Sequence, residues 1–135
     1  AEGGPVIAAD TSTWIAFLQG NAGEDVVLLD SALRDRQVVM PPVVLTELLS
    51  DPGLPPRVSR SLAELPLLEP SPGYWQRAGA LRAKVLAARR KARLGDALIA
   101  QSCIDANVLL LTRDRDFRAF ARAARLNLLI GSASR

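Results

Sequence analysis

The sequence predicts an α/β fold: a three-layer α/β/α sandwich with a central, mostly parallel sheet of four to five strands. Short apolar runs typical of buried strands alternate with longer segments of helical periodicity along the whole chain. Parallel strands need a crossover between them, usually a helix, so this alternation favours a parallel sheet covered on both faces. The length of 135 residues fits one domain, and 49% apolar residues suffice for one substantial core.

The strands are predicted from five short, mainly apolar runs. The expected strands are residues 5–9, 37–40, 66–70, 108–112 and 126–130. The expected helices between and after them are residues 11–20, 24–36, 41–50, 57–65, 71–92, 94–107 and 113–124. Thr11 or Ser12 suits the cap of the first helix and Gly20 its end, two prolines open the third, and Ser71 suits the cap of the long helix that ends near Ala92.

One domain is expected over residues 1–135, with residues 1–4 and 131–135 frayed, because no repeat, low-complexity tract or linker interrupts the chain. Residues 51–56 are expected to form a turn. No apolar run approaches the roughly 20 residues of a membrane span, and the amino end lacks the pattern of a signal peptide. We therefore expect a cytoplasmic protein without a membrane partner.

Composition excludes several kinds of site. The chain contains no histidine, which excludes histidine-based triads, imidazole general bases and imidazole-ligated zinc. Its single cysteine, Cys103, excludes an intrachain disulfide and a thiolate zinc site. Any metal must therefore be held by oxygen atoms, which points to Mg²⁺ or Mn²⁺.

Positive charge is concentrated in one block. The formal net charge is +3, yet residues 77–95 carry seven basic side chains and no acidic one, which leaves 10 basic and 14 acidic residues elsewhere. Such a block suits a polyanion such as RNA, and it equally suits a solvated helix face or the acidic residues of a partner. Helical spacing groups its candidate RNA-binding residues on roughly two faces, one with Arg82, Arg89 and Arg93 and one with Lys84 and Lys91.

Acidic residues beside apolar segments form the candidate site. Asp10 ends the first predicted strand, Asp114 and Asp116 follow the strand 108–112, Asp96 opens a helix, and Glu47 lies inside an apolar one. In open parallel sheets, ligands bind beyond the carboxyl ends of the strands. Carboxylates that converge there repel one another, by about 4 kcal/mol per pair at 4 Å and an effective dielectric of 20. A hard divalent ion bound through oxygen relieves that repulsion and retains waters that can react.

Each of these acids also has a purely structural explanation. Asp10 suits a helix cap, Asp96 a charge at the positive end of a helix, and Asp114 the cap of the helix that follows it. Asp116 suits a first-turn acid paired with a neighbouring arginine, and Glu47 suits a side chain that reaches solvent at the helix edge. Their combination beside four apolar segments favours a shared site.

Four segments, taken in order, resemble the PIN domain family and, within it, the VapC-type toxins of toxin–antitoxin pairs. These are AADTSTWIAFL, PPVVLTELL, RLGDALIAQSC and LLLTRDRDFRAF, at family-like separations over nearly the whole chain. The resemblance implies a PIN-like fold and an acidic metal site made of Asp10, Glu47, Asp96 and Asp114. It makes Asp116 an accessory ligand or a helix-start charge. The supporting hydroxyl residues that it implies are Thr11, Ser12 and Thr112.

The resemblance implies an endoribonuclease that depends on Mg²⁺, with Mn²⁺ as a substitute. A metal-activated water would attack an RNA phosphodiester and leave a 5′-phosphate and a 3′-hydroxyl. Glu47 would be a further ligand or would orient the water. Elementary chemistry agrees, because a chain without histidine lacks the usual acid–base pair for attack by the ribose 2′-hydroxyl.

The resemblance also implies partners. It implies a cognate VapB-type antitoxin whose tail covers the acidic site. It further implies a toxin homodimer that forms a heterotetramer or a larger assembly with the antitoxin. The leucine-rich segments WIAFL and VVLTELL are candidates for the dimer face.

Three other functions also use an acid at a strand end or the same fold. A phosphatase of the haloacid dehalogenase type needs a second aspartate two residues after the first, where this chain has Ser12. A receiver-like signalling domain needs an acidic pair and a late lysine, whereas the last lysine here is Lys91. A catalytically inactive RNA-binding or scaffold domain with the same fold stays open, because only an assay separates it from a nuclease.

Overall fold

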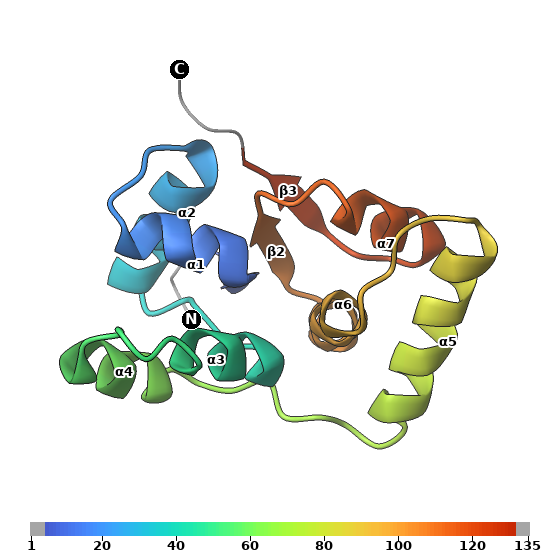
Figure 1. Ribbon diagram of the computed structural model, residues 1–135, viewed down its shortest axis with the longest axis horizontal. Helices are drawn as coiled ribbons and strands as arrows, with labels where there is room; N and C mark the ends of the chain where they lie inside the picture. Colours follow the sequence, from blue (N-terminus) through green and yellow to red (C-terminus); the bar gives the residue numbers. More distant parts are fainter. Residues whose placement is uncertain (1–4, 132–135) are drawn as a thin grey trace.

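A parallel sheet lies at the centre of the computed structural model, which describes residues 5–131 (Figure 1). Its strands are β1 (Ile7–Ala9), β2 (Leu109–Thr112) and β3 (Leu128–Ile130), in the order β1-β2-β3. Ile7 pairs with Leu109, and Leu110 pairs with Leu128, which fixes the register. The predicted parallel α/β fold is therefore confirmed.

Two of the five predicted strands are reduced to single bridges. Val38 bridges Ile7, and Met40 bridges Leu67, both in the parallel orientation. The described sheet therefore has three strands rather than four to five. Prolines limit the second bridge, because Pro41 follows Met40, Pro66 precedes Leu67, and neither proline has an N–H to donate to a ladder.

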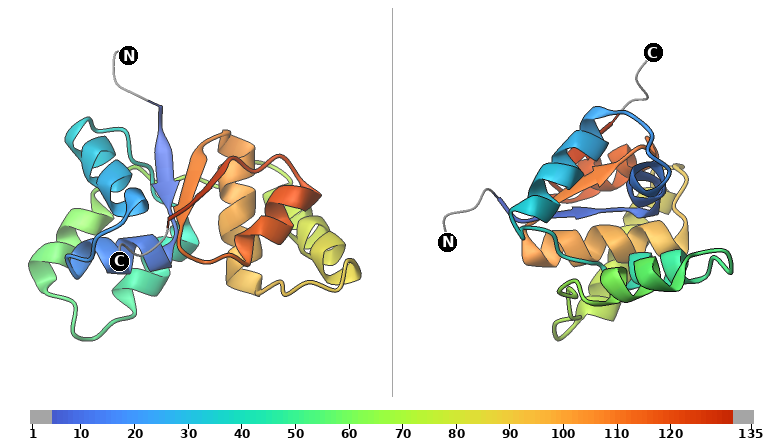
Figure 2. Two further views of the ribbon diagram at one scale, coloured as in Figure 1. Left: turned by 90° about the horizontal axis from the view of Figure 1, so that it is seen from above. Right: turned by 90° about the vertical axis from the view of Figure 1, so that its left-hand side faces the viewer.

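Seven helices surround the sheet in the described part of the chain. They are α1 (Thr11–Leu18), α2 (Glu24–Arg34), α3 (Pro42–Leu49), α4 (Pro56–Ala63), α5 (Tyr74–Ala87), α6 (Leu94–Ala106) and α7 (Phe117–Ala123). On one face of the sheet α2 contacts β1 and β2, while on the other α6 contacts β2 and α7 contacts β3 (Figure 1, Figure 2). This is the predicted three-layer arrangement, with α5 packed against α6 and α7.

The path of the chain creates a switch point between β1 and β2. From β1 the chain runs first to the bridged residues Val38 and Met40 on one side, and later returns to β2 and β3 on the other. Ligands bind at such a point, beyond the carboxyl ends of the two strands. The buried alanines and leucines of β1 and β2, together with the fully buried Phe117 and Phe120 of α7, hold this part of the sheet in the core.

Two helices begin differently from the prediction. α1 is capped by Asp10 rather than by a hydroxyl residue, because Asp10 Oδ1 accepts the N–H of Thr13 over 3.1 Å. α7 begins at Phe117 instead of residue 113, because Asp114 Oδ1 accepts the N–H of Asp116 over 2.9 Å and forms a turn before the helix. The capping role suggested for Asp114 is therefore wrong, and the one suggested for Asp10 is confirmed.

The long helix α5 is shorter than predicted at both ends. It begins after Gly73, which has a left-handed φ of 82°, rather than at Ser71. It ends at Ala87 rather than near Ala92, because Arg89 adopts a left-handed φ of 60° and the chain turns away. The remaining helix ends agree with the predicted ones to within two residues.

Residues 1–4 and 132–135, which were expected to be frayed, lie outside the described residues. Gly131 was grouped with that tail, but it is buried and donates its N–H to the carbonyl of Thr112 over 2.7 Å. Among residues 5–131, no helix has both the length and the apolar character needed to cross a lipid bilayer.

Candidate functional site

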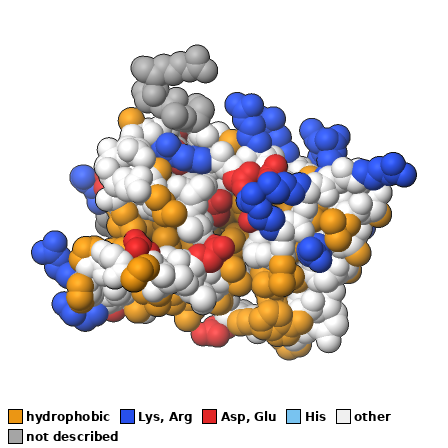
Figure 3. Space-filling model, viewed as in Figure 1, with side chains coloured by type: hydrophobic (Ala, Val, Ile, Leu, Met, Phe, Trp, Pro, Cys, Tyr) orange, Lys and Arg blue, Asp and Glu red, His pale blue; other side chains and the backbone are white. Residues whose placement is uncertain are grey.

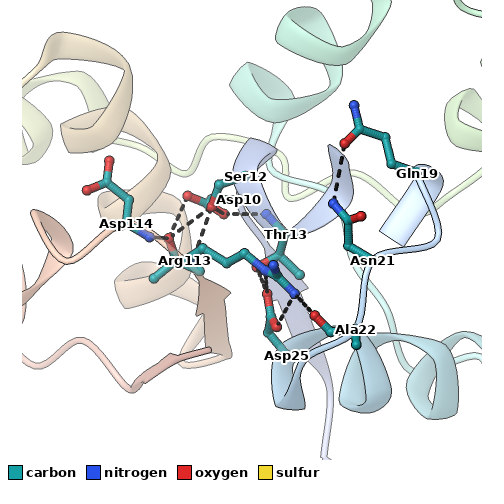
Figure 4. A network of polar contacts seen from close by, with 10 residues as sticks. Asp10, Ser12, Thr13, Gln19, Asn21, Ala22, Asp25, Arg113 and Asp114 are labelled. Atoms are coloured by element: carbon teal, nitrogen blue, oxygen red, sulfur yellow. Dashed lines mark hydrogen bonds and ion pairs between the residues drawn. The ribbon is translucent and has the colours of Figure 1, made fainter. Parts of the chain in front are cut away.

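Asp10 lies at the carboxyl edge of the sheet and is only 5% exposed. Its carboxylate accepts the hydroxyls of Ser12 and Thr112, each over 2.6 Å, and the N–H of Thr13 over 3.1 Å (Figure 4). Burial raises the pKa of Asp10 despite these three hydrogen bonds, and the nearby charge of Asp114 adds a smaller rise. Asp10 is thus firmly placed, and its negative charge is not fully compensated by its neighbours.

Thr112 and Ser12 join the ends of β1 and β2. Thr112 Oγ1 donates to Asp10 and accepts the N–H of Asp114 over 2.9 Å. Ser12 Oγ donates to Asp10 and accepts the N–H of Arg113 over 3.0 Å. The loop after β2 therefore has a fixed start, and it presents Asp114 at the same edge as Asp10.

Glu47 reaches this edge from α3. The hydroxyl of Thr11 donates to Glu47 Oε1, which links α1 to α3. A Cβ added at Gly95, in the first turn of α6, would lie 3.6 Å from Glu47 Oε2, so the other carboxylate oxygen lies beside the start of α6. Glu47 is nevertheless exposed, and the explanation that it reaches solvent is confirmed.

Asp96 lies in the first turn of α6, directly after Gly95, which is beside Glu47. Its pKa is raised to about 6, first by burial and then by the charge of Asp114. Arg93 opposes this rise, and the charges of Asp10 and Glu47 add to it. Three acids from separate segments thus lie near enough to Asp96 to act on its ionisation. Asp10 and Asp114 share the hydroxyl of Thr112 at the edge of the sheet, and Glu47 lies beside Gly95, the residue that precedes Asp96.

Asp116 lies beside this group and has a basic partner. Lys91 Nζ lies 3.5 Å from Asp116 Oδ2, and Arg93 Nη1 lies 3.5 Å from Asp114 Oδ2. The ion pair expected between Asp116 and Arg113 or Arg115 is therefore formed with Lys91 instead. We call the edge of the sheet where Asp10 and Asp114 lie, with Asp96 and Glu47 beside it, the acidic edge. Two residues of the basic block thus supply counter-charges there.

The donor set suits a hard divalent cation by its chemistry. The four carboxylates, with the hydroxyls of Thr11, Ser12 and Thr112 beside them, offer oxygen atoms. A divalent cation would also relieve the repulsion by Asp114 that adds to the effect of burial on the pKa of Asp96. Within residues 5–131, however, no three acidic side chains are grouped closely enough to form a metal site as they stand. The acids are therefore gathered at one edge without a finished coordination shell.

The other predicted RNA-binding residues have different surroundings. Arg82 is partly buried, and its Nε donates to the carbonyl of Ala92 over 2.8 Å, which braces the segment between α5 and α6. Lys84 Nζ lies 3.4 Å from the carbonyl oxygen of Ala123 and links α5 to the end of α7. Arg89 is exposed and lines an open cavity.

A buried ion pair next to the site was missed by the sequence reasoning. Asp25, in the first turn of α2, is fully buried, and Arg113 Nε lies 2.8 Å from Asp25 Oδ2 (Figure 4). Thr13 donates its hydroxyl to the same oxygen over 2.8 Å, and Arg113 also donates to the carbonyl of Ala22. Burial acts to raise the pKa of Asp25, but the hydrogen bonds from Arg113 and Thr13 outweigh it and hold the pKa below its usual value.

This ion pair fixes the residue that precedes Asp114. Arg113 is held between Asp25 and the loop before α2, while the carboxylate of Asp114 points away from it (Figure 4). The close approach requires Gly131, because an added Cβ there would lie 2.3 Å from Asp25 Cγ. The one sequence signal was an arginine directly after an apolar strand, which indicates no particular partner.

The fold and the site define an α/β domain in which carboxylates from distant segments meet where adjacent parallel strands end. The model of the PIN domain family matches residues 7–123. The chain therefore belongs to the PIN domain family, which supports assigning it to the nucleases. The sequence has no significant match among curated proteins.

Solved structures confirm the PIN-like fold. The chain is similar to VapBC-5 from Mycobacterium tuberculosis, a member of the VapBC family of toxin–antitoxin systems, with a TM-score of 0.67 and 21% identity over 94% of this chain and 99% of that one. DNA-bound VapBC from Salmonella typhimurium gives a TM-score of 0.69 and 18% identity over 94% and 98%. FitAcB from Neisseria gonorrhoeae gives a TM-score of 0.64 and 20% identity over 92% of this chain and 96% of that one. Sequence identities this low support a shared fold and nothing further.

Proposed function

We propose that this chain is a metal-dependent endoribonuclease that acts as the toxin of a toxin–antitoxin pair. The observation that carries the proposal is the hydroxyl of Thr112, which bonds both Asp10 and Asp114, with Glu47 beside the start of α6 that carries Asp96. Membership of the PIN domain family supports the nuclease activity. The fold shared with structures of VapBC toxin–antitoxin systems supports the toxin role.

The proposed chemistry assigns a role to each acid. Mg²⁺, or Mn²⁺ in its place, would lower the pKa of a water and neutralise charge on the phosphate. Asp10, Asp96 and Asp114 would hold the ion. Glu47, held by Thr11 and open to solvent, would be a further ligand or would orient the attacking water. The RNA products would carry a 5′-phosphate and a 3′-hydroxyl.

Asp116 and the hydroxyl residues would support this site. Ser12 and Thr112 would hold Asp10 in place through their hydrogen bonds of 2.6 Å. Asp116 donates its N–H to Asp114 and pairs with Lys91, so it would act chiefly as a helix-start charge that orients Asp114. Arg93, which is 3.5 Å from Asp114, would meet the incoming phosphate.

The proposal includes a VapB-type antitoxin and a toxin homodimer. The exposed apolar residues Ile15 and Leu18 of α1 line a cavity of about 230 Å³ with Leu54, and Glu47 lies at the same cavity. An antitoxin tail seated there would cover the acidic edge. A small DNA-binding protein encoded beside this gene, co-purifying with the chain as a heterotetramer or larger complex, is the expected partner.

The nuclease proposal is tested with RNA, the purified chain and added metal. Cleavage is expected with Mg²⁺ or Mn²⁺, is expected to stop with EDTA, and is expected to return when the metal is restored. Asp10→Asn should abolish it. Asp35→Asn, which changes an exposed carboxylate at the end of α2, should leave it unchanged. Binding of RNA without cleavage under every metal condition would instead support an inactive RNA-binding domain.

A further inference from the structure

Five arginines surround an open cavity of about 410 Å³ between α7 and the segment that follows α5. We call it the arginine groove, and its arginines are Arg89, Arg90, Arg115, Arg118 and Arg122. A neighbouring cavity of about 530 Å³ shares Arg90 and Arg122 and extends to Lys84. Lys and Arg side chains gather over α7 and the end of α5, next to acidic side chains at the centre of the same face (Figure 3).

The arginine groove has a large excess of positive charge. All five arginines are exposed, and none forms an ion pair with a carboxylate of residues 5–131. The one acid that lines the groove is Asp116, which already pairs with Lys91. Because like charges around one cavity repel each other, the arrangement favours a ligand that carries several negative charges.

The groove begins at the acidic edge. Lys91 lines the groove and contacts Asp116, whose N–H donates to Asp114 of the candidate site. Arg93, two residues beyond Lys91, contacts Asp114 directly. A polymer with one phosphate at the acidic edge would therefore have its neighbouring phosphates at the mouth of the groove.

The walls of the groove are fixed before any ligand binds. Arg115, Arg118 and Arg122 follow the spacing i, i+3, i+7, which places them along one face of α7 and the turn before it. On the opposite wall, the left-handed Arg89 ends α5, and Arg82 holds the segment after it through the carbonyl of Ala92. The backbone of both walls therefore needs no rearrangement, whereas the exposed arginine side chains lose rotamer freedom when they bind a ligand.

We propose that the arginine groove binds the sugar–phosphate backbone of the RNA strand on one side of the cleaved phosphate. The inference rests on the proposed ribonuclease function and adds the residues that hold the substrate and the side on which they lie. An acidic protein segment is the less suitable ligand, because Ala119 is the sole apolar residue lining the groove, and a protein partner needs apolar anchors. On the other side of the acidic edge, Ile15, Leu18 and Leu54 offer an apolar surface that does not suit phosphates.

The test measures RNA binding in the non-cleaving Asp10→Asn background. A short unstructured RNA oligonucleotide is titrated between 50 and 200 mM salt, and the logarithm of the binding constant is plotted against that of the salt concentration. For a single strand the slope is about −0.7 for each phosphate neutralised. The double variant Arg118→Ala/Arg122→Ala should therefore flatten the slope by about 1.4 and weaken binding on the order of 20-fold at 100 mM salt.

The control is Arg57→Ala/Arg60→Ala, which removes the same charge from two exposed positions about one helical turn apart on α4. It should change the slope little. Equal slopes in the two double variants would overturn the inference. Poly-L-glutamate, titrated in the same way, serves as a probe for an acidic protein segment. If Arg118→Ala/Arg122→Ala loses poly-L-glutamate binding but keeps RNA binding, the inference is overturned and the groove is assigned to an acidic protein partner. Failure of the proposed function is distinguishable, because it appears as an absence of cleavage by the unmodified chain.

Cleavage by the unmodified chain gives a second readout. RNAs extended on one side of the cleaved bond should have a lower KM, and extension on the other side should have little effect. Arg118→Ala/Arg122→Ala should remove that gain and leave kcat nearly unchanged. An equal gain from both extensions, or a gain that survives in the variant, would contradict the proposed position of the strand.

Discussion

Thr112, the last residue of β2, donates its hydroxyl over 2.6 Å to the carboxylate of Asp10, the residue that follows β1. The two residues are 102 positions apart in the sequence and meet at the switch point of the sheet. The same hydroxyl accepts the N–H of Asp114. One side chain therefore sets the positions of two proposed metal ligands, so the acidic edge is organised before any ion binds.

Replacement of Thr112 by valine keeps the shape of the side chain and removes this link. Because Thr112 is fully buried and bonds to a carboxylate, Thr112→Val should lower the free energy of unfolding by about 1.5–3 kcal/mol. Denaturation in urea measures the change. Thr46→Val, at an exposed position of α3, is the control and should stay within about 0.5 kcal/mol of the parent. Similar losses in the two variants would show that the link contributes nothing.

Arg113→Met should lower the free energy of unfolding more than Thr112→Val does, because it leaves the buried charge of Asp25 without its partner. The expected loss in the free energy of unfolding is about 3–5 kcal/mol. Arg34→Met is the control, since Arg34 is exposed and pairs with Asp30 at 3.1 Å within one helix. That variant should lose less than about 1 kcal/mol. If Arg113→Met is as mild as the control, the ion pair does not hold the loop before Asp114.

Two glycines should respond to alanine in opposite directions. Gly131→Ala pushes a methyl group against Asp25 and should lower the free energy of unfolding by about 1–3 kcal/mol. Gly79→Ala lies inside α5 with open space around the added methyl group, so it should raise the free energy of unfolding by about 0.5–1 kcal/mol. Thermal unfolding of both variants checks the pair. A stabilised Gly131→Ala would mean that Gly131 does not press against Asp25.

The pH dependence of stability should carry the signature of Asp96. Its pKa is about 6 in the folded protein, against an ordinary value of 3.8 that applies to the unfolded chain. Between these values the folded state binds more protons, so the contribution of Asp96 to the free energy of unfolding falls as pH rises from 4 to 6 and is level above 6. Asp96→Asn should remove that decline, as followed by urea denaturation at several pH values. An unchanged decline in the variant would contradict a raised pKa of Asp96, which burial and then the charge of Asp114 produce.

Asp25 should affect the pH dependence of the free energy of unfolding in the opposite direction to Asp96, and at lower pH. Its pKa is held below the ordinary value of 3.8, so its ionised form stabilises the folded state above that pH. The contribution is lost as pH falls below 3.8 through the lower folded pKa. Asp25→Asn should therefore reduce the loss of stability at acid pH, whereas Asp96→Asn should leave that part of the curve intact.

The strand-end acids were predictable from the sequence, because apolar strands that end in carboxylates place them at a known edge of a parallel sheet. Asp10 and Asp114 were located in this way. The partnership of Asp25 and Arg113 was not predictable, because the two residues are 88 positions apart and meet only through tertiary packing. An apolar run also does not distinguish a ladder from a single bridge, which is why the sheet was predicted to be larger than it is.

The path of the chain through the basic block, residues 77–95, was also not predictable from the sequence. A run rich in arginine and lysine favours a helix, so α5 was predicted to continue to about Ala92, whereas Arg89 ends it in a left-handed conformation. That turn moves the basic residues off the helix and forms one wall of the arginine groove. The spacing of Arg115, Arg118 and Arg122 was the available signal for the other wall, but the sequence did not indicate which surface they faced.

Direct measurement of Mn²⁺ binding tests most directly whether Asp10, Asp96 and Asp114, from three separate segments, jointly hold a divalent cation. Free Mn²⁺ is followed by electron paramagnetic resonance during titration into the purified chain near neutral pH. We expect saturable binding that weakens in each of Asp10→Asn, Asp96→Asn and Asp114→Asn and is unchanged in Asp35→Asn. An absence of saturable binding, or binding that all four variants leave equal, would contradict it.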